Sequence, residues 1–199
     1  MKIQFPETKI LFDDGFQSVM PFSDQLKAFS PMMSIITGYI GGESNWDLRL
    51  GGYGKNHLTK ENIRNLSDKG WLIISHTVTH RALDVLSDDQ VRLELIQSKN
   101  KIEDLTGKSC QSLSFPFGRF NEKVLDIALS AGYEHFYSNR LGLTNQKVHS
   151  VYSVYRWDDI STVRKKLERN YLERRKLQLI NYCSGGTVLL QKILGNKNL

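Results

Sequence analysis

Apolar residues along this chain gather in short runs that are separated by polar and glycine-containing segments. Runs this short are typical of buried strands, because a buried helix would need roughly ten residues or more. We therefore predict strands at 9–12, 32–37, 71–75, 112–114, 135–138 and 151–155.

Between these runs, apolar residues recur at spacings of three and four, which predicts helices with one buried face. Thr59 is the expected N-cap of one helix, and residues 87–90 form a capping box ahead of another. The predicted helices cover 16–29, 59–67, 87–105, 122–130 and 162–179, and Pro21 is expected to break the first one near its start. Strands that alternate with helices indicate one α/β domain, which we assign to residues 1–199.

The stretch 71–80 is the most informative part of the chain. Its apolar half ends where His76 and His80 follow, four residues apart. This spacing places both rings on one side of an extended segment, and it also aligns them on a helix. Neutral imidazole is the commonest protein ligand for transition metals, so we interpret the pair as candidate metal ligands. The alternative is two unrelated polar residues at a strand end.

A second strand, at 9–12, ends in Asp13, Asp14 and Gly15. Adjacent carboxylates on a strand point to opposite sides, so we expect the two to have different roles. The alternative is that Asp-Gly is simply turn chemistry.

Composition limits the class of protein. A hydrophobic content of 40% and a charged content of 24% are ordinary for a soluble globular domain of 199 residues. No run approaches the roughly 18 apolar residues of a membrane helix, and the first residues lack the apolar core of a secretory signal, so we expect a cytoplasmic protein. Cys110 and Cys183 are far apart, without metal-type spacing, and are expected to be reduced.

The net charge of +6 comes with a strongly basic last helix. We interpret that helix as a solvated surface rather than as a membrane or nucleic-acid site. A glycine-rich segment at 38–54 lacks a phosphate-loop pattern, which excludes nucleotide binding there. Its Trp46 could stack on a sugar ring or could simply anchor the loop.

Polar groups therefore follow three predicted strands: Asp13 and Asp14, the two histidines, and the loop at 116–118. In a barrel of parallel strands these ends meet at one face. One carboxylate and two histidines can hold a metal with positions open for water and substrate. A metal acidifies such a water, and the spare carboxylate can accept its proton. This chemistry is metal-assisted hydrolysis of an amide or ester.

These motifs resemble those of the polysaccharide deacetylases, the family-four carbohydrate esterases. Residues 11–15 match the Thr-Phe-Asp-Asp-Gly motif, with Leu11 in place of Thr, and residues 76–80 match the His-Ser/Thr-x-x-His motif. The Phe-Pro-Phe-Gly-Arg-Phe-Asn loop at 115–121 looks like the third motif, and the resemblance covers about residues 9–140.

The resemblance implies a distorted (β/α)7 barrel that removes acetyl groups from N-acetylated sugars. By position, Asp13 would be the general base, and Asp14, His76 and His80 would be the ligands of a divalent metal. Zinc is expected, with cobalt, nickel or manganese as alternatives. The Phe117 backbone N–H would be the oxyanion donor, and Thr77 would steady the histidine loop. Pro116, Gly118, Trp46 and Arg156 are the expected substrate-binding residues.

The sequence also departs from the family pattern. Ser114 stands where an Arg usually contacts the base, and Arg156 is either a replacement cation or an ordinary surface residue. No His follows His149, so the C-terminal Leu-x-His motif with its general acid is missing. His149, His57 and His135 are the candidate proton donors. This leaves a non-catalytic sugar- or partner-binding module, or a hydrolase of another N-acyl compound, as alternatives.

Overall fold

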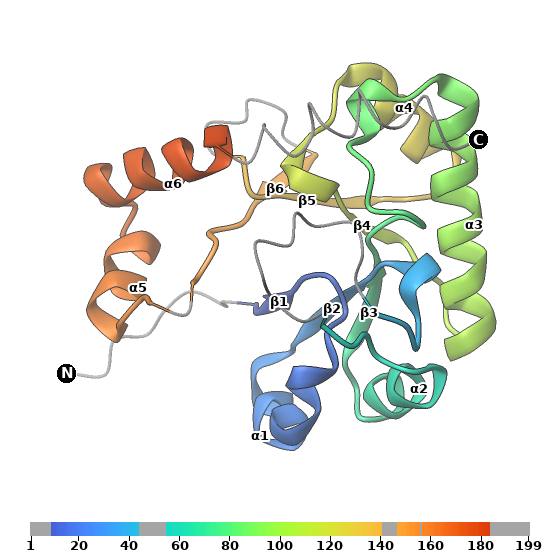
Figure 1. Ribbon diagram of the computed structural model, residues 1–199, viewed down its shortest axis with the longest axis horizontal. Helices are drawn as coiled ribbons and strands as arrows, with labels where there is room; N and C mark the ends of the chain where they lie inside the picture. Colours follow the sequence, from blue (N-terminus) through green and yellow to red (C-terminus); the bar gives the residue numbers. More distant parts are fainter. Residues whose placement is uncertain (1–8, 44–54, 141–146, 156, 184–199) are drawn as a thin grey trace.

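The computed structural model describes residues 9–43, 55–140, 147–155 and 157–183. In this part of the chain the strands form one parallel sheet in the order β1-β2-β3-β4-β5-β6, so that each strand pairs with the next one along the sequence (Figure 1). The strands are β1 (Leu11–Phe12), β2 (Met32–Ile35), β3 (Leu72–Ser75), β4 (Ser112–Ser114), β5 (His135–Ser138) and β6 (Val148–Ser150).

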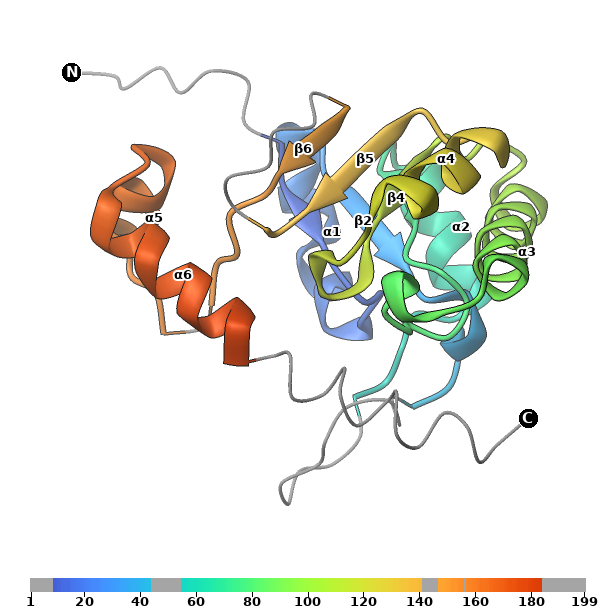
Figure 2. The same ribbon diagram turned by 90° about the horizontal axis from the view of Figure 1, so that it is seen from above.

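Helices connect the strands. The α-helices are α1 (Ser23–Leu26), α2 (Lys60–Asp68), α3 (Asp88–Thr106), α4 (Glu122–Ser130), α5 (Ile160–Leu167) and α6 (Tyr171–Cys183). Short 3-10 helices are η1 (Gln17–Phe22), η2 (Lys27–Phe29), η3 (Thr37–Tyr39), η4 (Leu83–Val85) and η5 (Pro116–Gly118). The curled sheet is partly enclosed by α1 to α4, whereas α5 and α6 stand apart from them, beyond β6 (Figures 1 and 2). This is the predicted distorted α/β barrel, with six strands in the described residues.

The sheet is buried because both of its faces are apolar. All four residues of β2 are buried, and Met33 pairs with Ile73 of β3 in parallel register. The apolar stripe of α3 packs on the same core, which also includes Val91, Leu95 and Ile102. A near-continuous apolar run is what a parallel strand covered on both faces requires.

The predicted helix starts at Thr59 and Ser87 are confirmed. Each hydroxyl accepts the N–H of the residue three positions later, and each helix has a complete capping box. Within the described residues, no helix has both the length and the apolar content needed to cross a membrane.

Two predictions of secondary structure were wrong, and a third was confirmed in part. The helical segment over 16–29 is broken near Pro21 as expected, because Pro21 has no N–H to donate, but it forms η1, α1 and η2 rather than one longer α-helix. The last strand lies at β6 rather than at 151–155. The last helix divides into α5 and α6, because Arg169 adopts a left-handed φ of 58°. Trp46 and Arg156 lie outside the described residues.

Candidate metal centre

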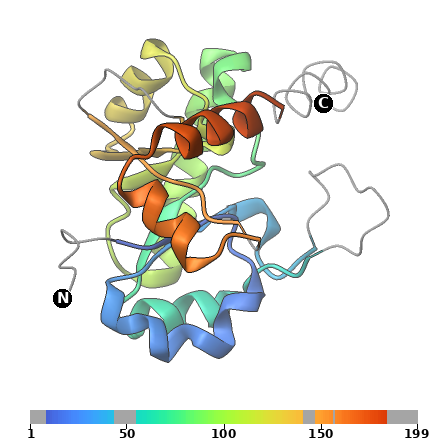
Figure 3. The ribbon, with the colours of Figure 1, turned by 90° about the vertical axis from the view of Figure 1, so that its left-hand side faces the viewer.

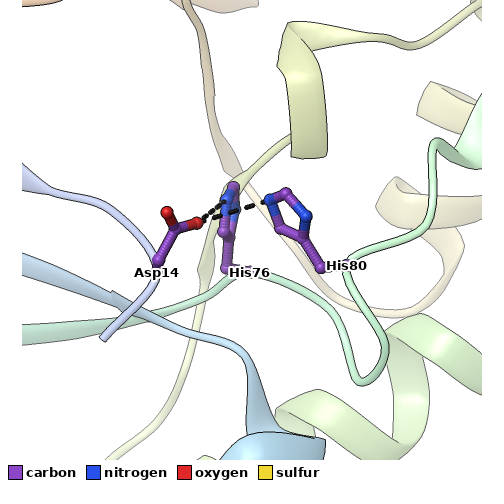
Figure 4. A group of neighbouring side chains, drawn as sticks. All are labelled: Asp14, His76 and His80. Carbon is purple, nitrogen blue, oxygen red and sulfur yellow. Dashed lines mark ion pairs between the residues drawn. The ribbon is translucent and has the colours of Figure 1, made fainter. Parts of the chain in front are cut away.

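Three side chains meet at the carboxyl ends of two strands, β1 and β3, which flank β2 in the sheet. Asp14 follows β1, and His76 and His80 follow β3 (Figure 4). The Oδ1 atom of Asp14 lies 3.4 Å from the Nε2 atom of His76 and 3.4 Å from the Nε2 atom of His80. One donor atom from each residue lies within 4.8 Å of the others. The structure therefore brings together the three residues that the sequence predicted as ligands.

The backbone at these positions is unusual. Asp14, Thr77 and His80 have φ angles of 72°, 66° and 59°, in the left-handed region that residues other than glycine rarely adopt. Each such residue costs about 1–3 kcal/mol and persists only where surrounding contacts hold it. The contacts around Asp14 and around the 76–80 loop must supply this stabilisation.

His57 supplies one of these contacts. Its Nδ1–H donates to the backbone carbonyl of Asp14 at 2.8 Å, and the amide of Leu58 donates to the carbonyl of Gly15, also at 2.8 Å. The His57 ring is buried between Phe16 and Tyr39, and its Nε2 atom has no hydrogen-bond partner among the described residues. The turn that aims Asp14 is thus fixed by a segment more than 40 residues away.

Glu94 on α3 supplies the other contacts. Its Oε2 atom accepts the backbone N–H groups of Val78 at 2.7 Å and Thr79 at 3.0 Å, and its Oε1 atom accepts the Thr79 hydroxyl. The Thr77 hydroxyl accepts the His80 N–H at 3.2 Å, so it steadies the loop in the predicted way. Glu94 was missed from the sequence, although it is a charged residue on the apolar face of a helix, which is a recognisable signal.

The loop at 76–80 also lies very close to Gly38, which follows the carboxyl end of β2. The Gly38 amide donates to the Val78 carbonyl at 2.9 Å, and a Cβ atom on Gly38 would come within 2.5 Å of that oxygen. No side chain fits there, so a glycine is needed at this position.

The tautomer of His76 follows from its second contact. Its Nδ1–H donates to the backbone carbonyl of Ser114 at 2.7 Å. The lone pair then sits on Nε2, which is the atom that faces Asp14. Two imidazole nitrogens and a carboxylate oxygen that converge in this way suit zinc and related divalent metals.

Burial and neighbouring charges set the ionisation of the three groups. Burial raises the pKa of Asp14, but the hydrogen bond and charge of His76, with the charges of His80 and His57, outweigh it, and the pKa is lowered. Burial lowers the pKa of His80 to about 3, and the charge of His76 acts in the same direction. Burial also lowers the pKa of His76, but the carboxylates of Asp13 and Asp14 outweigh it, and the pKa is raised. At neutral pH Asp14 is an anion and His80 is neutral, which are the states a metal ligand needs.

Asp13 stands next to this cluster without belonging to it. Its Oδ1 atom accepts the hydroxyl of Ser34 at 2.6 Å and the hydroxyl of Ser114 at 3.0 Å. Its side chain is exposed at the mouth of the site. Ser114 stands at the position where the sequence comparison with the family expected an Arg. It still contacts Asp13, but through a neutral hydroxyl.

The loop at η5 forms the opposite wall. Phe117 has a φ of 56°, and its ring packs against the ring of His80 with the centroids 4.7 Å apart. Among the described residues, the Phe117 N–H has no protein acceptor. Pro116 and Gly118 are buried beside it. This wall is tied to the segment after His80 by Arg119, whose Nε and Nη2 atoms bond the Asp84 carboxylate at 2.8–3.1 Å.

The three candidate proton donors lie in different places. His57 contacts Asp14 directly. His135 is the first residue of β5 and so lies at the amino end of the sheet, away from the cluster. His149 is the middle residue of β6, where its ring stacks on Tyr137 with the centroids 5.5 Å apart. Of the three, only His57 is brought to the cluster.

Comparisons with known proteins agree with this geometry. The Bacillus subtilis (strain 168) protein YxkH, provisionally described as a polysaccharide deacetylase, is 34% identical over 80 residues, which is 40% of this chain and 29% of YxkH. The polysaccharide deacetylase BC0361 from Bacillus cereus superposes with a TM-score of 0.63 at 19% identity, over 79% of this chain and 50% of BC0361. The Streptococcus pyogenes deacetylase PplD, in complex with acetate, gives 0.54 at 23% identity, over 64% of this chain and 54% of PplD.

The two structural matches, both below 25% identity, show a shared fold. This chain spans about half of each solved structure and less than a third of YxkH. The sequence profile of the polysaccharide deacetylases matches residues 8–136, which is well over half of the chain and includes the metal cluster, Asp13 and the η5 loop. The chain therefore belongs to the polysaccharide deacetylase family.

Proposed function

We propose that this protein is a metal-dependent hydrolase that removes N-acetyl groups from amino sugars of a polysaccharide or a glycan precursor. Membership of the family supports deacetylation of a glycan. The observation that carries the finer proposal is the position of Asp13, a spare carboxylate held by Ser34 and Ser114 beside the cluster of Asp14, His76 and His80.

In this proposal Asp14, His76 and His80 hold a divalent metal, most plausibly zinc. The metal, when bound, acidifies water and polarises the acyl carbonyl. The protein must still orient the groups and move the protons, and its own residues are placed for both tasks.

Asp13 acts as the general base. Two hydroxyls bind its Oδ1 atom, which fixes the carboxylate plane and leaves Oδ2 to accept a proton from the attacking water. The leaving amine needs a proton, and Asp13 can return the one that it has accepted. This route needs no separate proton donor, and His57 is the alternative donor.

The Phe117 N–H stabilises the oxyanion. It lies in a loop with a left-handed φ, it has no protein acceptor among the described residues, and its ring contacts His80. A preorganised N–H aimed at developing negative charge is worth about 3–4 kcal/mol in comparable sites. Pro116 and Gly118 shape the wall on which the acetyl group would lie.

The test measures acetate release from a panel of N-acetylated oligosaccharides with zinc- or cobalt-loaded protein. Asp13→Asn keeps the shape of the carboxylate but removes the base, so we expect one metal per chain and turnover about 10²–10⁴-fold lower. Asp14→Asn should lose the metal. Asp24→Asn, an exposed carboxylate on α1, is the control and should match the wild type. Full activity of Asp13→Asn would refute the proposal.

The second candidate function is a deacetylase-like module that binds sugar without turnover. In the described structure His135 and His149, two of the three candidate proton donors, lie away from the cluster, which favours it. Calorimetry that detects oligosaccharide binding by metal-loaded protein, together with no acetate release from the whole panel, would support this candidate over the enzyme. Release from non-sugar N-acyl compounds alone would keep the chemistry and change the substrate.

A further inference from the structure

The positive charge of this protein is concentrated in its last two helices. Residues 160–183 hold seven Lys and Arg residues against two Glu residues, a net charge of +5 out of +6 for the whole chain. The remaining residues are therefore nearly neutral in sum. Helices α5 and α6 also lie outside the residues that match the family, so the deacetylase fold does not account for them.

The two helices form an outer layer on one side of the molecule. Figure 3 shows α5 and α6 side by side in front of the sheet. Leu177 of α6 is buried and faces inward. On α5, the Lys166 side chain is also buried, where its Nζ atom pairs with the Asp158 carboxylate and donates to the Ser153 carbonyl at 3.0 Å. These contacts fix which faces of the helices look outward.

The outward stripe of α5 alternates apolar and basic residues. Ile160, Arg164 and Leu167 follow one another at spacings of four and three, and Ile160 is 84% exposed. Trp157, directly before the helix, is 65% exposed and stacks on Tyr155.

The outward stripe of α6 repeats this pattern. Leu172 and Leu179 are 73% and 64% exposed, and Arg175 and Lys176 lie between them on the same face. Exposed aliphatic residues that alternate with cations on both helices are unusual for a face that contacts water alone.

We propose that the outward face of α5 and α6 docks on an anionic lipid bilayer. Amphipathic helices that interleave Lys and Arg with Leu, Ile and Trp lie in the interface of such membranes, where phosphate groups neutralise the cations and acyl chains cover the apolar side chains. Nucleic acid would match the charge but leave the aliphatic residues uncovered. A second copy of the chain would cover them but would bring two basic faces together.

Docking does not depend on the proposed function, and its test uses no substrate. The full chain is sedimented with vesicles of phosphatidylcholine alone and with vesicles that contain phosphatidylglycerol. We expect binding to the anionic vesicles only, and weaker binding as salt is raised. Each cation near the surface contributes about five-fold in affinity, so the triple variant Arg164→Gln, Arg175→Gln, Lys176→Gln should bind roughly 100-fold more weakly.

Two matched controls test whether binding depends on the outward face of α5 and α6 rather than on the total charge or total hydrophobicity of the protein. The variant Lys60→Gln, Arg92→Gln, Lys101→Gln removes three exposed cations from α2 and α3 and should bind like the wild type. Leu172→Ser with Leu179→Ser should reduce binding, whereas Leu93→Ser with Ile96→Ser on α3, where those side chains are 56% and 46% exposed, should not.

Three results would overturn the proposal. The first is no binding to anionic vesicles at low salt. The second is an equal loss of binding in the control variants, which would mean that net charge alone is responsible. The third is a concentration-dependent dimer that Leu172→Ser with Leu179→Ser dissociates, which would make a second copy the occupant of this face.

Discussion

Glu94 should control metal affinity although it is no ligand. Its side chain is 8% exposed and accepts two backbone N–H groups and one hydroxyl from the loop between His76 and His80. A buried N–H without an acceptor costs ~1–3 kcal/mol; because Val78 is half-buried and Thr79 is exposed to water, Glu94→Ala should destabilise the loop by about 1–3 kcal/mol in all. Glu94→Gln keeps an acceptor without the charge, and because charge-assisted bonds are roughly twice as strong, it should cost ~1–2 kcal/mol.

The lost stability should appear mainly as weaker metal binding, because the loop carries His76 and His80, two of the three expected ligands, and holds Thr77 and His80 at left-handed φ angles. Supporting residues of metal ligands typically contribute about 10–100-fold to affinity. We expect the metal dissociation constant, measured by competition with a chelator, to rise about 10-fold in Glu94→Gln and about 100-fold in Glu94→Ala.

Glu103→Ala is the matched control. Glu103 lies on the same helix and accepts the Cys110 N–H at 2.9 Å while pairing with Lys99 at 3.1 Å, away from the histidine loop. It should lower the free energy of unfolding and leave metal affinity unchanged. If Glu94→Gln and Glu94→Ala bind metal within two-fold of the wild type while their stability falls, the reasoning is refuted.

Further predictions concern other residues around the candidate metal site. Gly38→Ala places a Cβ within 2.5 Å of the Val78 carbonyl, so it should displace the histidine loop and weaken metal binding about 10-fold or more, measured by the same chelator competition. Ser114→Ala removes one of two hydroxyls on Asp13, and we expect kcat to fall by about 5–10-fold with the metal content unchanged, measured by acetate release and metal analysis. In metal-free protein the ring of His80 should stay neutral at pH 5, whereas the ring of His76 should take up its proton above pH 6.5, as seen by NMR, because their pKa values move in opposite directions from 6.5. Since the unfolded chain takes up a proton at His80 that the folded chain does not, His80 should lower the stability of the metal-free protein as pH falls below 6.5.

The sequence predicted the barrel and the metal cluster because both depend on local patterns. Short apolar runs mark the strands, and the polar groups that follow them meet because parallel strands share one carboxyl edge. That rule brings one of the two carboxylates to His76 and His80, and the resemblance to the family singled out Asp14 as the expected ligand.

What the sequence did not predict depends on contacts between distant segments. Ser34 and Ser114 reach Asp13 from 21 and 101 residues away, and Glu94 reaches Val78 from 16. The break at Arg169 is local, but the helical periodicity on either side obscured it, whereas the break near Pro21 was predicted. The one sign of these contacts in the sequence is Glu94, a charged residue on the apolar stripe of a helix.

The pair of Arg119 and Asp84 has a consequence for the divergence of this protein from its relatives. The two side chains are only 29% and 14% exposed and are joined by three contacts, so replacing either one alone leaves a largely buried charge without its partner. The two positions should therefore change together in evolution. Because they connect the Phe117 loop to the segment after His80, a paired change at both positions would let this loop move relative to the candidate metal site without unfolding the sheet beneath it.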